Sequence, residues 1–221
     1  MQFLPTAHIH HHQIVSYSQL SHNAREIVAK FTLATSQEVQ LGCDWYPSAL
    51  KISARIGEKY GLSAQVVAGV IAALSPNNRW ERNIIDAENV IKAWRHGDDD
   101  DVLAVKVCTY KPMLAKALQI LNSASCYIVD ILNGPKITEF YNCITNPAMT
   151  DVCIDGHAYS VWFGQRLTMK EVPPIGKKLR ATIKQDYRDA TAFINEELSE
   201  HFYPADIQAI TWVTHKRIYN V

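Results

Sequence analysis

Asp155 is the residue best placed for chemistry, because it follows the short apolar run 152–154 and directly precedes a segment whose apolar residues recur at helical spacing. An aspartate at this position is a good helix cap, since its carboxylate accepts hydrogen bonds from the first free backbone N–H groups. A carboxylate fixed in this way can also stabilise a cationic transition state, or align and deprotonate a water molecule. The sequence is therefore compatible with a structural cap and with a catalytic carboxylate.

Metal binding by Asp155 and His157 is a further alternative, but no other cluster of histidine and acidic residues at ligand spacing supports it. His8 and His10–12 could bind a metal adventitiously, although residues 1–20 are expected to form a mobile, peripheral segment. We therefore predict neither a metal nor another cofactor.

The elements expected to position these side chains are helices. Apolar residues recur with the helical period along most of the chain, and there is neither a convincing strand pattern nor an internal repeat. The predicted helices begin after Ser21 or Asn23 and then cover residues 45–60, 66–74, 79–94, 111–121, 126–132, 137–144, 177–200 and 204–219. A polar break is expected at 42–44 and a solvated loop at 97–101. The predicted fold class is all-α, with about ten helices.

Two motifs precede Asp155 in the chain. Residues 74–77, Leu-Ser-Pro-Asn, close one predicted helix and open the next, and residues 132–138, Leu-Asn-Gly-Pro-Lys-Ile-Thr, form a turn followed by a helix. With residues 154–157, Ile-Asp-Gly-His, they match in order and spacing the LSxQ, LPGVGxKTA and VDxH segments of helix–hairpin–helix DNA glycosylases. The chain between residues 45 and 219 therefore resembles this superfamily, which has the endonuclease III-like fold.

The resemblance implies a fold of two lobes with a cleft between them. Residues 22–60 and 176–221 would form one lobe and residues 64–145 the other, within a single unit that covers residues 21–221. Asp155 would lie where the chain crosses back between the lobes, on the wall of the cleft, where ligand sites are common. It would then be the essential aspartate of the superfamily, and would stabilise the sugar cation that forms when a base leaves DNA.

Lys136 lies before Asp155 at a spacing close to that of the nucleophilic lysine in relatives with lyase activity, where a desolvated amine attacks C1′ and forms a Schiff base. Contact with a DNA phosphate or with solvent is the alternative. Gly134 corresponds to one of the two hairpin glycines that let backbone N–H groups approach a phosphate in these relatives. Here the second glycine is missing, and Pro135 lacks an N–H group.

Asn77, Asn78, Arg79 and Trp80 occupy the position from which the related enzymes insert side chains into the gap left by a flipped base. The two asparagine amides could pair with the orphaned base, and Arg79 or Trp80 could stack. The alternatives are helix capping by the asparagines and packing of Trp80 in the core.

Trp45, Tyr46 and Trp212 lie at helical spacing and are candidates for the core. Tyr46 or Trp212 could instead line a pocket for the base. His157, within the segment that carries Asp155, is also expected to contact the substrate.

The function expected from the resemblance is cleavage of, or action at, the N-glycosidic bond of a flipped nucleotide in DNA. An iron–sulfur cluster, which some relatives carry near the C-terminus, is not expected, because no cysteine follows Cys153. Two alternatives remain open. One is a phage-type enzyme that modifies DNA bases by acting on an activated thymine derivative, and the other is a non-catalytic DNA-binding module on the same scaffold.

The composition fits a single globular unit, since 221 residues of which 48% are hydrophobic can bury a sizeable core. The formal net charge of zero argues against a strongly electrostatic, sequence-blind coat on DNA. A basic stretch, residues 166–188, could contact phosphates or form a solvated helix face. The apolar runs are too short for a membrane span and no signal peptide is evident, so we expect a cytoplasmic protein, in the host cytoplasm if phage-encoded. The five scattered cysteines are expected to be reduced and buried.

Overall fold

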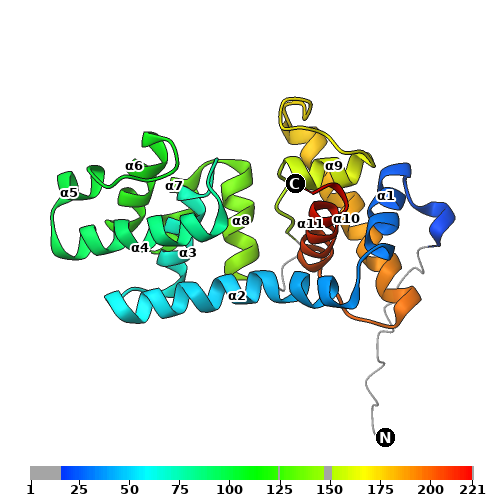
Figure 1. The fold of residues 1–221 in the computed structure, drawn as a ribbon, viewed down its shortest axis with the longest axis horizontal. Helices are drawn as coiled ribbons and strands as arrows, with labels where there is room; N and C mark the ends of the chain where they lie inside the picture. The colour runs from blue at the N-terminus through cyan, green and yellow to red at the C-terminus, as the bar shows by residue number, and fades with distance from the viewer. Residues whose placement is uncertain (1–15, 124, 147–150, 221) are drawn as a thin grey trace, which may run out of the picture.

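A computed structural model describes residues 16–123, 125–146 and 151–220, and this part of the chain contains helices and no strand (Figure 1). The α-helices are α1 (His22–Thr32), α2 (Ser36–Tyr60), α3 (Ala64–Leu74), α4 (Trp80–His96), α5 (Asp99–Leu103), α6 (Lys111–Leu121), α7 (Ile128–Leu132), α8 (Pro135–Thr145), α9 (Gly156–Phe163), α10 (Lys177–Leu198) and α11 (Pro204–Tyr219). Two short 3-10 helices, η1 (Tyr17–Gln19) and η2 (Ser125–Tyr127), complete them. The prediction of an all-α protein is confirmed. The histidines at positions 8 and 10–12 lie outside the described residues.

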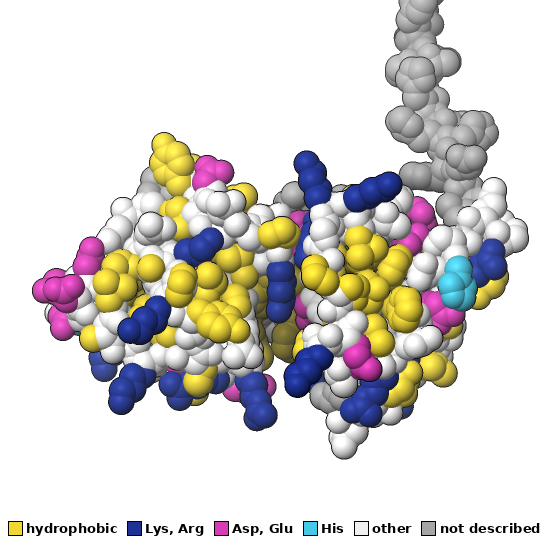
Figure 2. Space-filling view, turned by 90° about the horizontal axis from the view of Figure 1, so that it is seen from above, with side chains coloured by type: hydrophobic (Ala, Val, Ile, Leu, Met, Phe, Trp, Pro, Cys, Tyr) yellow, Lys and Arg dark blue, Asp and Glu magenta, His cyan; other side chains and the backbone are white. Residues whose placement is uncertain are grey.

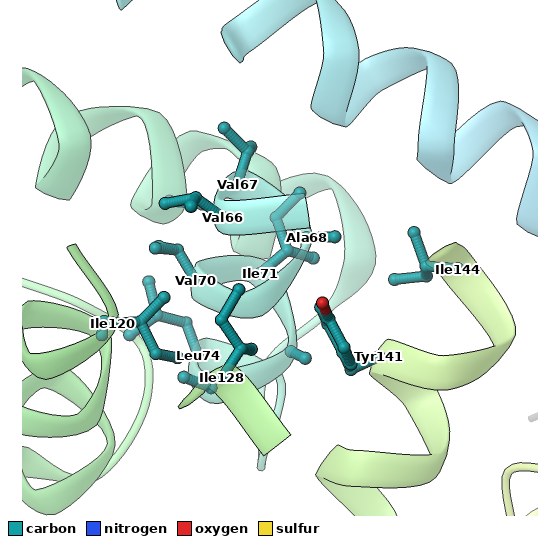
Figure 3. Packing of buried hydrophobic residues seen from close by; sticks show 14 of the residues in the cluster. Val66, Val67, Ala68, Val70, Ile71, Leu74, Ile120, Ile128, Tyr141 and Ile144 are labelled. Atoms are coloured by element: carbon teal, nitrogen blue, oxygen red, sulfur yellow. The ribbon is translucent and has the colours of Figure 1, made fainter. Parts of the chain in front are cut away.

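The helices pack around two hydrophobic clusters, which form the left and right halves of the molecule in Figure 1. The first, called here the α3 cluster, surrounds α3, in which every residue from Val66 to Leu74 is buried. A helix that is apolar on every face must be covered on every face. Figure 3 shows its side chains in one cluster with Ile120 from α6, Ile128 from α7 and Tyr141 from α8.

The second cluster, called here the α10 cluster, is formed by α1, α9, α10 and α11 together with the segment before α9. Helix α2 runs along both clusters (Figure 1). Residues 46–60 of α2 pack in the α3 cluster, whereas the expected lobes place all of residues 22–60 with the C-terminal helices. The apolar face of one long helix therefore serves both halves.

The polar break predicted at residues 42–44 is wrong, because α2 begins at Ser36 and continues through it. Thr35 and Glu38 start the helix with reciprocal hydrogen bonds between each side chain and the other residue's backbone N–H group. Gly42 permits close packing of α2 against α11, since a Cβ atom there would lie 2.6 Å from the Cα atom of Ile210. A glycine that suggests a break is used here for helix contact.

The solvated loop predicted at residues 97–101 is also wrong in part. Asp98 caps the short helix α5, accepting a hydrogen bond of 3.0 Å from the backbone N–H of Asp101. The run of aspartates that indicates a loop is suited to the first turn of a helix, where the partial positive charge of the backbone N–H groups favours acidic side chains.

The five cysteines are all free thiols, but they are not all buried as predicted. Cys143 and Cys153 are buried and Cys43 is half-buried, whereas Cys108 and Cys126 are exposed. Cys108 lies in the segment between α5 and α6, and Cys126 lies in the short 3-10 helix η2, directly before α7.

Candidate active site

A cavity of about 940 Å³ is lined by residues from both halves of the molecule. The molecule is hollowed between these halves when it is seen from above (Figure 2). Every candidate site residue from the sequence analysis except Gly134 lines the cavity: Asp155, Lys136, Asn77, Asn78, Arg79, Trp80, His157, Tyr46 and Trp212. The remaining lining residues are Trp45, Ser75, Glu81, Asn83, Phe140, Cys153, Gly156, Met169, Gln208, Ala209 and Lys216.

Asp155 caps α9, as predicted, and its Oδ1 atom accepts a hydrogen bond of 2.8 Å from the backbone N–H of Ala158. The side chain is half-buried and borders the cavity. Gly156 follows it at a place where Met169 packs closely, since a Cβ atom on Gly156 would lie 2.7 Å from the Met169 Sδ atom. The carboxylate therefore has a fixed direction at the positive end of a helix while part of it faces the cavity.

The backbone just before Asp155 is held by a buried ionic network. The N–H of Ile154 donates a hydrogen bond of 3.0 Å to Glu139 Oε2 in α8. Arg180 Nη1 in α10 donates to the same oxygen at 2.6 Å and to the Ile154 carbonyl at 3.1 Å. Since Glu139 and Arg180 bind opposite sides of one residue, they fix the path of the chain that presents Asp155.

Lys184 extends this network by bridging two carboxylates, Glu139 at 2.8 Å and Asp151 at 2.5 Å. Burial raises the pKa of Glu139, despite its cationic partners. Burial alone would also raise the pKa of Asp151, but hydrogen bonds from Asn142 and Lys184 hold it below its usual value. Lys184 and Arg180, both in the basic stretch 166–188, are thus committed to internal ion pairs and do not offer their charges to phosphates.

The walls of the cavity are largely aromatic. The Trp45 ring lies 5.3 Å from that of Trp80 and 5.0 Å from that of Trp212, measured between centroids, and Phe140 meets Trp80 edge-on at 6.3 Å. Each of these side chains is half-buried, so the packing and pocket-lining alternatives are both realised. Such a wall suits a flat, conjugated ligand.

The loop between α3 and α4 divides its residues between two roles. Asn78 Nδ2 donates to the carboxylate of Asp86 at 3.0 Å and to the Leu74 carbonyl at 3.3 Å, so this amide holds the loop. Asn77 has a left-handed backbone, with φ of 56°, and is exposed together with Arg79. These two side chains are free to reach a ligand.

Lys136 lies in the first turn of α8 and is exposed at the edge of the cavity. Among the described residues, no side chain pairs with its ammonium group. Gly134 is the N-cap of α8 and does not line the cavity, and Asn133 before it has a left-handed backbone. The hairpin therefore contributes Lys136 to the cavity and not its glycine.

The charge around the cavity is mixed. Arg79, Lys136 and Lys216 contribute three cations, against the carboxylates of Asp155 and Glu81. Helices α4 and α9 begin at the cavity, and their N-terminal N–H groups add partial positive charge. The cavity thus combines one fixed carboxylate with surroundings that attract anions.

His157 contacts a second histidine, since its ring lies 5.9 Å from that of His215 in α11. His215 is 1% exposed. Burial, with smaller contributions from the charges of Lys30 and His157, lowers its pKa to about 4. His215 is therefore neutral at physiological pH and supports the cavity wall from behind.

This pKa predicts a pH-dependent stability. The folded-state pKa of His215 is lower than the usual value of 6.5, so the unfolded chain takes up a proton first as the pH falls. The free energy of unfolding should therefore decrease between about pH 6.5 and pH 4, by up to about 3 kcal/mol from this residue. Comparing urea unfolding of the wild type and His215→Phe across this range isolates the effect. Equal pH profiles for the two proteins would contradict it.

The fold and the cavity together define an all-helical protein in which two packed clusters enclose a carboxylate-bearing, aromatic-walled site. Residues 10–218 match the family model DUF7178, which is described as a family of unknown function, and the chain belongs to that family. No curated protein and no solved structure matches the chain.

Within the described ranges, no helix combines the length and apolar character that crossing a membrane requires. Over the same ranges, no three His, Cys, Asp or Glu side chains come together as a metal site would need.

Proposed function

We propose that this protein acts at the N-glycosidic bond of a nucleotide flipped out of DNA, on a two-lobed scaffold similar to that of helix–hairpin–helix DNA glycosylases. The observation that carries the proposal is the convergence of Asp155, the aromatic walls and three cations on one cavity. These residues come from five separate parts of the chain. Their convergence is what a base-removing site requires.

Each part of the cavity has a role in this proposal. A base in the cavity would stack on the rings of Trp45, Trp80 or Trp212, as flipped bases do between aromatic side chains. The sugar would then lie near Asp155, whose fixed charge stabilises the cation that develops at C1′ as the bond to the base lengthens. The same carboxylate can orient the water molecule that attacks C1′ and accept its proton.

Lys136 is assigned a phosphate contact in preference to the role of nucleophile. A nucleophilic lysine needs a desolvated amine, whereas this side chain is exposed. We expect Lys136→Ala to weaken binding to duplex DNA severalfold. The plot of log affinity against log salt concentration should become less steep, its negative slope decreasing in magnitude by about one. Titration at several salt concentrations measures this slope.

The matched control is Lys92→Ala, which removes an exposed lysine of α4 that does not line the cavity. Borohydride should trap no covalent complex with DNA. If the wild type formed a trapped complex and Lys136→Ala did not, Lys136 would be the nucleophile and the assignment of a phosphate contact would be wrong.

A second candidate function is displacement of a group on a modified base. The observation that favours it is the number of cations beside the aromatic wall, namely Arg79, Lys136 and Lys216, which could hold an anionic leaving group. This enzyme would change the base and keep it attached to the DNA.

The test is a product analysis on duplexes that each carry one damaged or modified base. Base removal releases a free base, detected by mass spectrometry, and leaves an abasic site that alkali cleaves. A base of changed mass in intact DNA would favour the second candidate. Binding without either product on any substrate would favour a non-catalytic DNA-binding protein.

A further inference from the structure

Gln208 in α11 presents its side-chain amide to the cavity, and contacts within the protein fix the orientation of this amide. The residue is 5% exposed and lines the cavity. The hydroxyl of Tyr46 donates a hydrogen bond of 2.7 Å to its Oε1 atom. Among the described residues no group accepts a hydrogen bond from its Nε2 atom, and part of the surface of this nitrogen remains accessible. Its two N–H groups are therefore available to a molecule in the cavity.

Tyr46 determines which end of the amide faces the ligand. Tyr46 is buried, and burial raises its pKa well above the usual value, so the hydroxyl keeps its proton. That proton needs an acceptor, and the Gln208 oxygen is a good one. If the amide were reversed, the proton would be left to the neighbouring thiol of Cys143, whose sulfur is a weak acceptor. The N–H groups of Gln208 therefore point away from Tyr46.

Trp212 lies one helical turn after Gln208, and residues four apart share a face of a helix. Both line the cavity. A flat ligand that contacts Trp212 in the cavity would thus lie beside the amide of Gln208. At the edge of a base an N–H donor pairs with an exocyclic carbonyl oxygen, whereas an exocyclic amino group in the same place would set donor against donor.

We propose that Gln208, oriented by Tyr46, is a specificity-determining residue that selects nucleobases with an exocyclic carbonyl oxygen, such as thymine, over adenine, whose only exocyclic group is an amino group. This rests on the proposed function in one respect, namely that the base enters this cavity. It does not depend on which bond is then broken. A base that places an amino group where the carbonyl oxygen would lie leaves the desolvated N–H groups of Gln208 unpaired, which carries a large penalty in a buried site.

The experiment measures binding to duplexes that are identical except for one unpaired, bulged nucleotide, either thymidine or deoxyadenosine. We expect the wild type to bind the thymidine duplex at least about tenfold more tightly. Gln208→Met keeps the length of the side chain and removes the donor, so the preference should disappear. Tyr46→Phe keeps the ring and frees the amide to rotate, so the preference should fall but not vanish.

Tyr187→Phe is the matched control, since Tyr187 is a fully buried tyrosine of the α10 cluster that does not line the cavity. It should keep the full preference. Thermal melting of all variants separates altered recognition from loss of the fold, and Tyr46→Phe tests the inference even if Gln208→Met does not fold.

Equal affinity of the wild type for both duplexes, or a preference that survives both Gln208→Met and Tyr46→Phe, would overturn the inference. Base release is measured on the same duplexes. A preference that depends on Gln208 without any release would leave the inference intact and remove the proposed chemistry. Base release without such a preference would support the proposed chemistry and overturn the role of Gln208. Failure to bind either duplex would contradict both the proposed function and the inference.

Discussion

Asp155→Asn is expected to lower the rate of base release by about a hundred- to a thousandfold while leaving the fold intact. Asparagine has nearly the same size as aspartate and caps helices about equally well, so the hydrogen bond to the Ala158 N–H can be kept. What is lost is the negative charge that, in the proposed reaction, stabilises the developing sugar cation. Binding to DNA should be unchanged or slightly tighter, because one charge that repels phosphates is gone.

The matched control for this variant is Asp98→Asn. Asp98 also caps a helix, α5, and accepts from a backbone N–H at 3.0 Å, but it does not line the cavity. The two variants should have similar melting temperatures, and only Asp155→Asn should lose turnover. If Asp155→Asn turned over normally, the catalytic role would be wrong. If it unfolded, Asp155 would be a structural cap alone.

Glu139→Gln is expected to have the largest effect on stability, about 3–5 kcal/mol. Glu139 is buried, and the substitution would leave the Arg180 guanidinium, and one contact of Lys184, without a countercharge in a region shielded from water. Because Glu139 also binds the backbone N–H of Ile154, the segment that presents Asp155 should loosen and turnover should fall as well. Denaturant unfolding and the product assay measure the two effects.

Glu88→Gln is the matched control, because Glu88 pairs with Lys59 at 2.6 Å on the surface. Exposed ion pairs typically contribute about 0–1 kcal/mol, so this variant should remain close to the wild type. A similar small loss for Glu139→Gln would mean that the buried network does not hold the site together.

The local elements of this fold could be predicted from the sequence because their signals are local. Ser21, Ser63 and Asp155 cap helices where the capping rules place them, and the apolar segment from Val66 to Leu74 is the buried helix that its composition indicates. The prediction failed where a residue's role depends on a distant partner. The start of α2 was missed because Gly42 suggests a break until its contact with α11 is known.

The same distinction applies to the candidate site. The order of three motifs suggested Asp155 and the residues around Trp80, which do line one cavity. Asn83 and Gln208 were missed, since each is an ordinary polar residue within a helix until the structure shows its partners. Asn83 Nδ2 donates to the Ile71 carbonyl at 3.0 Å, and Gln208 accepts from a tyrosine that is distant in sequence. Spacing alone contains no signal for such contacts.

The most direct test of the central claim compares two duplexes in which the target nucleotide is replaced by a sugar mimic without a base. One mimic is a pyrrolidine ring, protonated and therefore similar in charge to the sugar cation, and the other is an uncharged tetrahydrofuran ring. If Asp155 stabilises a sugar cation, the wild type should bind the charged mimic at least about a hundredfold more tightly, as expected for transition-state analogues. Asp155→Asn should abolish that difference and Asp98→Asn should keep it. Equal affinity of the wild type for the two duplexes, or a difference that persists in Asp155→Asn, would contradict the claim.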